Sequence, residues 1–473
     1  MARIEAALPG ARSLSESGPS SRRERRASTA PSVLSSALLA LFLFLIGSLS
    51  FSSALAQERS TAGLEVRVAP GQVSLVELAV PTPVALANQA DTLGLGALLQ
   101  ETVTRSLSLS GYFNLTEATL YPSEAAAEAM EPALVAWFNS GAQGLVKIGW
   151  RLEGERAQLT FKLFNLSSRE QVPLQGFAEP VMSARDPSEL RRVAHRFVDE
   201  VIRYYTGKVG FFHSRIAGVR RGRRGKQIFL FSADGVDQSM ITREGRLNLL
   251  PHFRRGRVYF TSYRGGGSHL YLYEGGNVRV VSSRSGLNMG AALHPNADQI
   301  ALALSHEGSS DIYLLNGSSG EIQRRLTRSR GIDISPTWSP SGDQIAFISD
   351  REGTPQIWVM DRDGSRQRRL TFQGKYNQSP RWSPDGRLIV FTGRDERYIF
   401  DIFTIVVETG EIHRLTQNQG SNEDPTWSPD GRHVAFVSSR SGRQEVHIMT
   451  SDGRSQQSLG PSTRGLTSLS WGW

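Results

Sequence analysis

The feature that most constrains this chain is a short segment that recurs three times in its C-terminal half. Residues 336–342 read Pro-Thr-Trp-Ser-Pro-Ser-Gly, residues 380–386 read Pro-Arg-Trp-Ser-Pro-Asp-Gly, and residues 425–431 read Pro-Thr-Trp-Ser-Pro-Asp-Gly. The tryptophans lie 44 and 45 residues apart, and a further 44 residues lead to Trp471. Degenerate copies precede them at Leu293 and His252. A fixed period of about 40–45 residues is typical of β-propeller blades, so the sequence predicts a ring of four-stranded sheets.

Each copy has the composition of one blade. A strand that contains the tryptophan meets a Pro-Asp-Gly turn, where proline fixes φ and glycine accepts the positive φ that a hairpin requires. Two β-branched segments follow, for example Gln344–Ile348 and Gln356–Met360, and the second ends at another Asp-Gly turn. A fourth strand ends in Arg-Leu-Thr or a related triplet. Four antiparallel strands per repeat are therefore expected.

The two ends of the repeat region complement each other. The first unit, Arg215–Thr242, has three strands but no tryptophan strand before them, whereas Leu466–Trp473 is a tryptophan strand with no blade after it. Joining the two gives six complete blades and leaves no sheet edge exposed. We therefore predict a six-bladed all-β propeller whose C-terminal strand closes the first blade. The recurrent tryptophans are expected to pack between blades rather than to bind a ligand.

The preceding region has a different pattern, which predicts a small α/β domain. Its longest helix is expected at Glu189–Tyr205, where apolar residues recur at steps of three and four and Thr206-Gly207 ends the run. The other expected elements are strands at Val73–Pro81, Gly144–Trp150 and Ala157–Leu166, and helices at Leu93–Leu109 and Glu131–Ser140. The predicted domains are a signal peptide at 1–56, the α/β domain at 57–206, a linker at 207–214 and the propeller at 215–473.

His195 and Asp199 lie one helical turn apart on the polar side of that longest helix. Such a pair could take part in catalysis, but a solvated i,i+4 pair on a helix surface explains the spacing equally well and is far commoner. We therefore expect both side chains to face solvent.

The N-terminus has the three parts of a secretory signal peptide. Arginines at 22, 23, 25 and 26 precede an apolar run from Val33 to Gly47, and Ala54-Leu55-Ala56 forms a small-x-small cleavage site. Cleavage after Ala56 would make Gln57 the first mature residue, by general secretion rather than the twin-arginine route. The run is short for a membrane span, so an uncleaved anchor is the less favoured alternative. The sequence predicts an exported protein with no membrane insertion after cleavage.

Composition excludes several function classes. The chain has no cysteine, which rules out disulfides and cysteine-based metal or nucleophile sites. Its net charge of +9 is spread thinly outside the signal region, so no nucleic-acid partner is expected. The sequence shows no nucleophile elbow, no phosphate-binding glycine loop and no paired-histidine metal motif. We therefore predict a non-enzymatic protein without catalytic residues, cofactor or metal.

The Trp-Ser-Pro-Asp-Gly repeats resemble those of the TolB family of the Tol-Pal system. The helix segment Leu190–Asp199, the junction Tyr205–Phe211, and Ser110–Phe113 and Glu65–Val68 in the first domain carry the same resemblance, which covers roughly residues 63–473. It implies a periplasmic monomer that supports outer-membrane integrity and envelope constriction at cell division.

The resemblance also implies two protein partners. A Pal-type outer-membrane lipoprotein would bind the mouth of the propeller, and a TolA-type inner-membrane protein would bind the mature N-terminus. The implied mouth residues lie on the loops that enter the tryptophan strands: Asn288, Gly290, Asp333, Ile334, Asn377, Gln378, Asn422, Glu423 and Asp424. The implied N-terminal segment is Leu64, Glu65, Val66 and Arg67. Leu287 stands where relatives can carry histidine.

Two other readings of the chain remain open. One is an exported propeller that binds carbohydrate, which would need aromatic side chains at the mouth, where only Tyr376 is an obvious candidate. The other is a hydrolase-associated module, although the chain has no room for a separate α/β-hydrolase domain.

Overall fold

The computed structural model describes most of the chain beyond residue 74. The described residues are 75–87, 89–123, 130–174, 177, 180–394 and 397–473. All of them belong to one compact unit. The predicted signal peptide and the segment Leu64–Arg67 lie outside the described residues.

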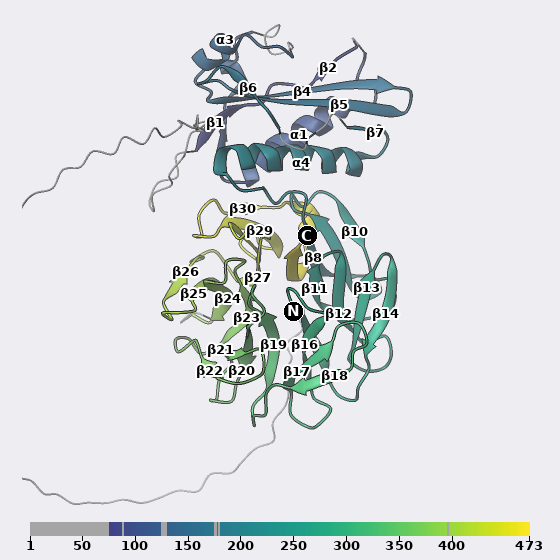
Figure 1. The fold of residues 1–473 in the computed structure, drawn as a ribbon, viewed down its shortest axis with the longest axis vertical. Coiled ribbons are helices and arrows are strands. Elements are labelled where there is room, and N and C mark those ends of the chain that lie inside the picture. The colour runs from purple at the N-terminus through teal and green to yellow at the C-terminus, as the bar shows by residue number, and fades with distance from the viewer. Residues whose placement is uncertain (1–74, 88, 124–129, 175–176, 178–179, 395–396) are drawn as a thin grey trace, which may run out of the picture. The chain divides into compact units, whose positions relative to one another are not determined.

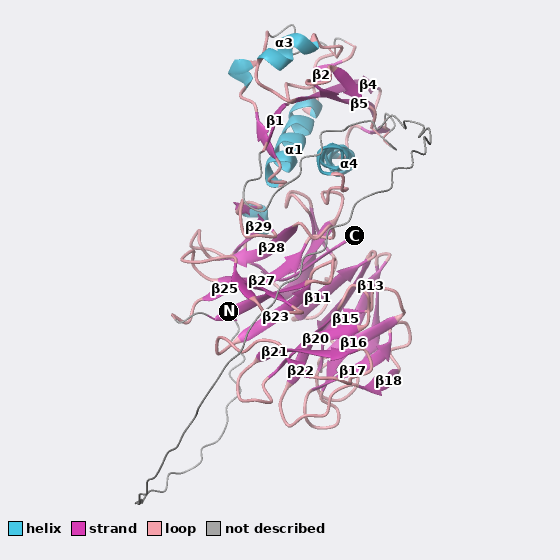
Figure 2. Ribbon diagram, turned by 60° about the vertical axis from the view of Figure 1, so that its left-hand side comes forward, coloured by secondary structure: helices cyan, strands magenta, loops and turns pink. Residues whose placement is uncertain are grey.

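The first domain is a mixed sheet with helices on both faces. Its central strands run in the order β3-β1-β4-β5-β6, with β2 paired to β4 and β7 paired to β5. The strands are β1 (Val76–Ala79), β2 (Val84–Ala85), β3 (Phe113–Leu115), β4 (Gly144–Glu153), β5 (Arg156–Asn165), β6 (Glu170–Val172) and β7 (Val181–Ser183). Helices α1 (Leu95–Leu109) and α4 (Pro187–Thr206) lie together against one face (Figures 1 and 2). The short helices are η1 (Ala118–Leu120) and α3 (Leu134–Asn139), and Trp137 of α3 is fully buried.

Helix α4 begins and ends as its sequence dictates. The Asp186 carboxylate accepts hydrogen bonds from the backbone N–H groups of Ser188 and Glu189, and Pro187 occupies the first turn. The helix ends at Gly207, whose φ of 72° is the left-handed conformation that glycine adopts at low cost.

The prediction that His195 and Asp199 face solvent is wrong. Each is only 2% exposed. His195 Nε2 lies 3.1 Å from Asp234 Oδ2 in the propeller, and Asp199 accepts hydrogen bonds from the backbone N–H groups of Phe212 (2.8 Å) and His213 (3.0 Å). The polar side of α4 is covered by the chain that follows it and by the first blade, which helix periodicity cannot reveal because it reports only one apolar face.

The propeller consists of six four-stranded antiparallel sheets, as predicted (Figure 1). The first blade has the order β10-β9-β8-β31, so the C-terminal strand closes the ring. Its strands are β8 (Arg215–Gly222), β9 (Gly225–Ser232), β10 (Gln238–Met240) and β31 (Leu466–Gly472), with η2 (Pro461–Thr463) just before the last.

The other five blades follow one another along the chain. The second has β11 (Asn248–Arg254), β12 (Arg257–Ser262), β13 (His269–Glu274) and β14 (Asn277–Ser282). The third has β15 (Asn288–Leu293), β16 (Gln299–Leu304), β17 (Asp311–Asn316) and β18 (Ile322–Arg325). The fourth has β19 (Asp333–Trp338), β20 (Gln344–Ser349), β21 (Gln356–Asp361) and β22 (Arg368–Arg369). The fifth has β23 (Asn377–Trp382), β24 (Leu388–Arg394), β25 (Phe400–Val406) and β26 (Ile412–Arg414). The sixth has β27 (Asn422–Trp427), β28 (His433–Ser438), β29 (Glu445–Thr450) and β30 (Gln457–Ser458).

The recurrent tryptophans pack between blades, as expected. Trp338 is 7% exposed and shares a hydrophobic cluster with Ala301 and Ile312 of the preceding blade. Its indole N–H donates to the Ala292 carbonyl oxygen at 3.0 Å, and Trp427 makes the equivalent bond to Arg381. These two tryptophans therefore tie their strands to the neighbouring sheet, whereas the buried indole N–H of Trp382 has no hydrogen-bond partner among the described residues.

Polar contacts join the first domain to the first and sixth blades. The Arg105 guanidinium donates to the carbonyl oxygens of Asp234 (2.9 Å) and Leu459 (2.8 Å). Burial alone would raise the pKa of Asp234, but the hydrogen bond from His195 and its charge outweigh burial and lower that pKa to about 2. His433 of the sixth blade is buried beneath this junction, with Nε2 2.8 Å from the Ser110 carbonyl oxygen.

Buried His433 is expected to make the protein less stable in mild acid. Burial lowers the pKa of His433 to about 4, whereas an unfolded histidine has a pKa near 6.5. As pH falls from about 6.5 to about 4, the unfolded chain binds a proton that the folded chain does not, so stability is lost on acidification. Replacement by glutamine (His433→Gln) should reduce this acid-induced loss of unfolding free energy by on the order of 3 kcal/mol. Urea denaturation across that pH window measures it. The half-exposed His413, as His413→Gln, is the matched control and should leave the profile unchanged.

Candidate functional site

The wall of the central channel is formed by the first strand of each blade, and all six strands contain the same irregularity. In each, the pairing register with the second strand shifts by one residue. The residue at the bulge has positive φ in every blade: Leu250 (51°), Gly290 (66°), Ser335 (53°), Ser379 (54°), Asp424 (53°) and Ser468 (55°). A bulge of this kind bends the strand and redirects its side chains. The six bulges form a ring part-way along the channel.

Two residues before the bulge, the inner strands carry a ring of buried polar residues. This ring contains four of the sequence-predicted partner contacts. Asn288, Asp333 and Asn422 are fully buried, and Asn377 is 3% exposed. Their side chains hold the blades together. The Asn377 amide donates to Gln356 Oε1 of the preceding blade at 2.7 Å, and the Asn422 amide donates to Asp401 Oδ1 at 3.0 Å.

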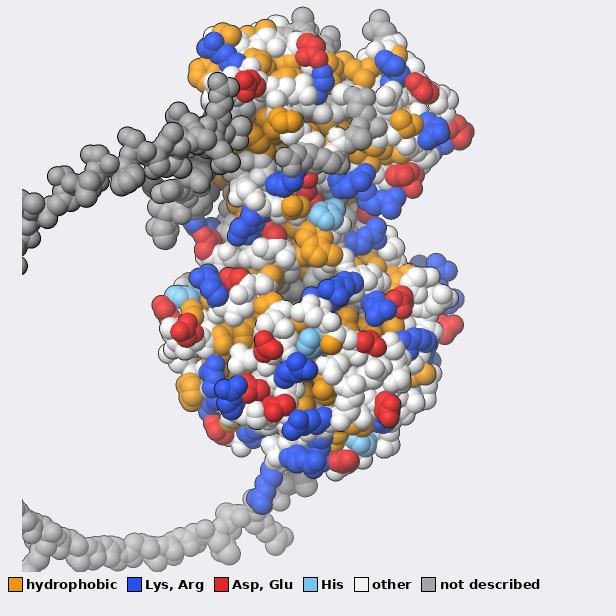
Figure 3. Space-filling model, in the orientation of Figure 1, with side chains coloured by type: hydrophobic (Ala, Val, Ile, Leu, Met, Phe, Trp, Pro, Cys, Tyr) orange, Lys and Arg blue, Asp and Glu red, His pale blue; other side chains and the backbone are white. Residues whose placement is uncertain are grey.

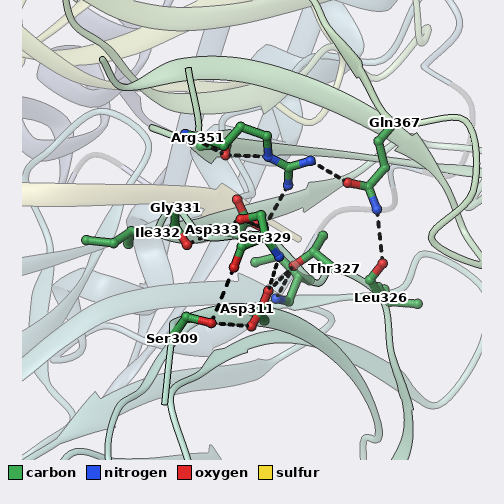
Figure 4. A network of polar contacts seen from close by, with 12 residues as sticks. Ser309, Asp311, Leu326, Thr327, Ser329, Gly331, Ile332, Asp333, Arg351 and Gln367 are labelled. Carbon is green, nitrogen blue, oxygen red and sulfur yellow. Dashed lines mark hydrogen bonds and ion pairs between the residues drawn. The ribbon is translucent and has the colours of Figure 1, made fainter. Parts of the chain in front are cut away.

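The fourth blade has a carboxylate at this position instead of an amide. Asp333 Oδ2 receives hydrogen bonds from Arg351 (2.8 Å) and Ser329 (3.1 Å), as Figure 4 shows. Asp311 of the preceding blade is held nearby by Thr327 and Arg325. These side chains position the loops at the mouth and are not themselves available on its surface, because they are buried inside the sheets.

The next residue of each strand lies closer to the surface. Ile334, Gln378 and Glu423 are half-buried and occupy equivalent positions in three successive blades. Burial, followed by the charge of Asp424, raises the pKa of Glu423. Asp424 itself accepts hydrogen bonds from the Ser468 N–H (2.7 Å) and the Ser379 hydroxyl (3.3 Å), and Gly290 is its counterpart at the bulge of the third blade. The structure thus brings the predicted mouth residues together around one opening.

Sequence reasoning missed an apolar arc at this opening. The residue before each ring asparagine or aspartate is hydrophobic in three successive blades: Leu247 is 39% exposed, Leu287 is 37% exposed and Ile332 is 51% exposed. Tyr376 follows at the same position in the fifth blade and is half-buried. Exposed apolar side chains that lie in one arc are a feature of protein-binding surfaces. The sequence does show this pattern, because an apolar residue stands one position before the recurrent Asn or Asp in these repeats.

A pocket of about 600 Å³ continues this face on the fifth blade. Phe391, Phe403 and Ile412 line it, together with Lys375, Arg394 and Tyr398. The Arg394 guanidinium lies 4.6 Å from the centre of the Tyr398 ring at the edge of this pocket.

Charged side chains of both signs occur on the described surface. On the face that Figure 3 shows, basic and acidic side chains are interspersed and hydrophobic side chains lie between them. Within the part of the chain that the structure describes, no three His, Asp or Glu side chains are grouped so as to hold a metal ion. No helix among the described residues is long and apolar enough to cross a membrane. A two-domain propeller protein with a shaped, partly apolar channel mouth is the class that these features define.

Comparison with known proteins identifies the family. The model of the TolB amino-terminal domain matches residues 64–172, and the model of the TolB beta propeller domain matches residues 203–472. The chain is 39% identical over 409 residues to the Tol-Pal system protein TolB of Anaeromyxobacter dehalogenans strain 2CP-C, a match that covers 83% of this chain and 91% of that protein. It is 32% identical over 428 residues to the Protein TolB homolog of Chlorobium luteolum, covering 89% and 94% respectively.

A solved structure has the same fold. The crystal structure of TolB from Acinetobacter baumannii matches with a TM-score of 0.70 at 22% identity, covering 84% of this chain and 96% of that one. The chain belongs to the TolB family of the Tol-Pal system.

Proposed function

We propose that this chain is a non-enzymatic adaptor of the Tol-Pal system in the periplasm. Its propeller mouth binds a Pal-type outer-membrane lipoprotein, and its mature N-terminus binds a TolA-type inner-membrane protein, which together support outer-membrane integrity and envelope constriction at division. The observation that carries the proposal is the apolar arc of Leu247, Leu287 and Ile332 on three successive blades. Family membership supplies the identity of the partners.

The rigid framework beneath the arc favours binding without large rearrangement. In the second to sixth blades the mouth loop ends on a buried polar side chain, and those of Asn377 and Asn422 are bonded to the preceding blade. A preorganised surface loses little conformational entropy when a partner binds. Among the predicted mouth residues, we expect Ile334, Gln378 and Glu423 to contact the lipoprotein, while Asn288, Asp333, Asn377 and Asn422 position them. Gly290 and Asp424 shape the ring at the bulge.

Replacement of the arc residue Ile332 by serine (Ile332→Ser) should weaken lipoprotein binding about tenfold, which corresponds to ~1.4 kcal/mol. Ile332 is half-exposed, so the change removes apolar contact area without opening a cavity in the sheet. Calorimetric titration of the mature protein with a purified Pal-type lipoprotein measures the affinity. The matched control is Val280→Ser, which alters an equally exposed side chain (49%) on the outer strand β14. Equal affinities for both variants would contradict the proposed surface.

Charge at the same opening gives an independent test of the site. Glu423→Lys places a cation beside Asp424 and should also weaken lipoprotein binding, whereas TolA-type binding should persist. Deletion of residues 57–67 should abolish TolA-type binding and leave lipoprotein binding unchanged. The deletion removes the proposed TolA segment Leu64–Arg67 but leaves the propeller intact.

The pocket on the fifth blade is the feature that favours carbohydrate binding as a second function. It places Tyr376 and Tyr398 at its rim, and aromatic faces commonly stack on sugar rings. Titration with soluble peptidoglycan fragments separates the two functions, because a carbohydrate site would be lost in Tyr398→Ala and kept in Ile332→Ser.

A further inference from the structure

The channel widens at the end opposite the mouth into a cavity of about 360 Å³. The ends of the six inner strands line it, including the recurrent tryptophans and the serines that follow them. Its titratable side chains are all basic. Among the described residues around it there are four basic side chains and no aspartate or glutamate; the basic ones are His252, Arg254, Arg255 and Arg381.

Arg381 is the exceptional residue of this wall. The equivalent residue is Thr337 in the fourth blade and Thr426 in the sixth, as the shared strand register shows. Arg381 Nη1 donates to the Pro380 carbonyl oxygen at 3.0 Å, and no carboxylate among the described residues lies within ion-pair distance of its guanidinium. The nearest acidic influence is Asp424, whose oxygens are already taken by Ser468 and Ser379. A partly buried cation with no carboxylate within ion-pair distance is costly to the fold.

His252 faces the same cavity from the opposite side of the ring, three blades away. Its Nε2 atom is buried and has no hydrogen-bond partner among the described residues, and the same holds for Nε of Arg254. Burial, followed by the charges of Arg381 and Arg254, lowers the pKa of His252 to about 3, so its imidazole is neutral at physiological pH. The cavity is therefore lined by the Arg381 guanidinium, by Arg254, whose Nε–H lacks an acceptor among the described residues, and by His252, whose Nε2 can donate in one of its two neutral tautomers.

We propose that this cavity binds a small free oxyanion of the carboxylate or phosphate type, held by Arg381 and His252. The planar guanidinium presents paired N–H donors that match the geometry of two oxyanion oxygens. Thr337, Thr426 and Ser470 add hydroxyl groups to the wall. The volume equals that of about twelve waters in the liquid, so a phosphate or a short dicarboxylate fits with some hydration. The site goes beyond the proposed function, since it lies at the other end of the channel from the mouth.

Isothermal titration of the mature protein with inorganic phosphate, and separately with succinate, tests the proposal at constant ionic strength. At least one of the two anions should bind with a saturable isotherm. The Arg381→Thr variant should bind at least tenfold more weakly, and His252→Gln should show a smaller loss. Arg381→Thr introduces the residue that neighbouring blades already carry, so it should fold, and its melting temperature in anion-free buffer should equal or exceed that of the unaltered protein.

The control removes the same charge elsewhere: Arg324→Gln alters an exposed arginine on the outer strand β18 and should bind the anion normally. A site-specific readout is the C2–H resonance of His252, whose titration should move to higher pH when the anion is bound. Absence of saturable binding, or equal binding by Arg381→Thr and Arg324→Gln, would overturn the proposal. Lipoprotein affinity measured in the same variants should stay unchanged, so that failure of the anion site and failure of the mouth are separable.

Discussion

Removal of the last strand, by deleting Leu466–Trp473, is expected to abolish the cooperative folding of the propeller. This strand is the innermost of the first blade and pairs with β8 on both sides of the bulge at Ser468. Without it the ring opens, and the edges of the first and sixth blades lose their partner. Exposed sheet edges of this kind pair with other chains, so the truncated protein should also aggregate.

The size of the effect follows from what the strand buries. Leu466 and Leu469 are each 1% exposed and Trp471 is 7% exposed. Burial of each such side chain contributes about 1.5–3 kcal/mol, so these three account for about 5–9 kcal/mol before any ladder hydrogen bond is counted. That is comparable with the entire free energy of unfolding of a typical domain, about 5–15 kcal/mol. Trp471 also donates its indole N–H to Ser214 at 2.7 Å, and Ser470 accepts from the Phe253 N–H at 2.9 Å.

Urea denaturation followed by circular dichroism measures the loss, with the two-state transition of the full mature chain as reference. Deletion of Trp473 alone is the matched control, because it lies beyond β31 and is 44% exposed. Addition of a synthetic peptide of residues 466–473 should restore part of the transition. A truncated chain that unfolds at the same urea concentration as the full chain would mean that closure by β31 does not stabilise the ring.

The ring could be predicted from the sequence because its determinants are local. A Pro-Asp-Gly turn beside a tryptophan strand specifies one hairpin, and its repetition every 44 or 45 residues specifies the number of blades. Closure followed from counting, since Leu466–Trp473 and Arg215–Thr242 are each incomplete alone. The helices of the first domain were also predictable from their periodicity. Strands of two or three residues, such as β2 and β7, were not, because so short a segment carries no readable pattern.

The properties of the mouth were less predictable, since they depend on contacts between distant residues. Asn377 and Asn422 were expected at a binding surface because the family resemblance places it on the loops that enter the tryptophan strands, but their side chains are buried against partners 21 residues earlier. His195 and Asp199 were misjudged for the same reason, as their partners lie in another domain or beyond the helix end. The bulge ring left no clear signal either, because Leu, Gly, Ser and Asp all occupy it. In each case tertiary contacts determine the environment and local composition does not.

The carboxylate of Asp333 provides the sharpest test of this inter-blade framework, because two substitutions should act in opposite directions. Asp333→Ala leaves the Arg351 guanidinium without its buried partner and should cost about 3–5 kcal/mol. Asp333→Asn should be no less stable than the unaltered protein and could gain up to about 1 kcal/mol. Asp333 Oδ1 is buried without a hydrogen-bond partner among the described residues, so the carboxylate is only half used.

The sixth blade shows why asparagine suits this position. There, Asn422 donates to Asp401 of the preceding blade at 3.0 Å and accepts from Arg440 at 3.2 Å. An asparagine in the fourth blade could donate to Asp311 and accept from Arg351 in the same way.

The reverse exchange, Asn422→Asp, is the matched control for the Asp333 substitutions. It replaces a donor by a second carboxylate beside Asp401, so it should destabilise the protein by about 1–3 kcal/mol. Urea midpoints of the three variants at neutral pH measure the order of stability. If Asp333→Asn were as damaging as Asp333→Ala, the charge of Asp333 itself would be required. The buried residue at this position would then not join the blades in the same way in the fourth blade as in the blades that carry asparagine.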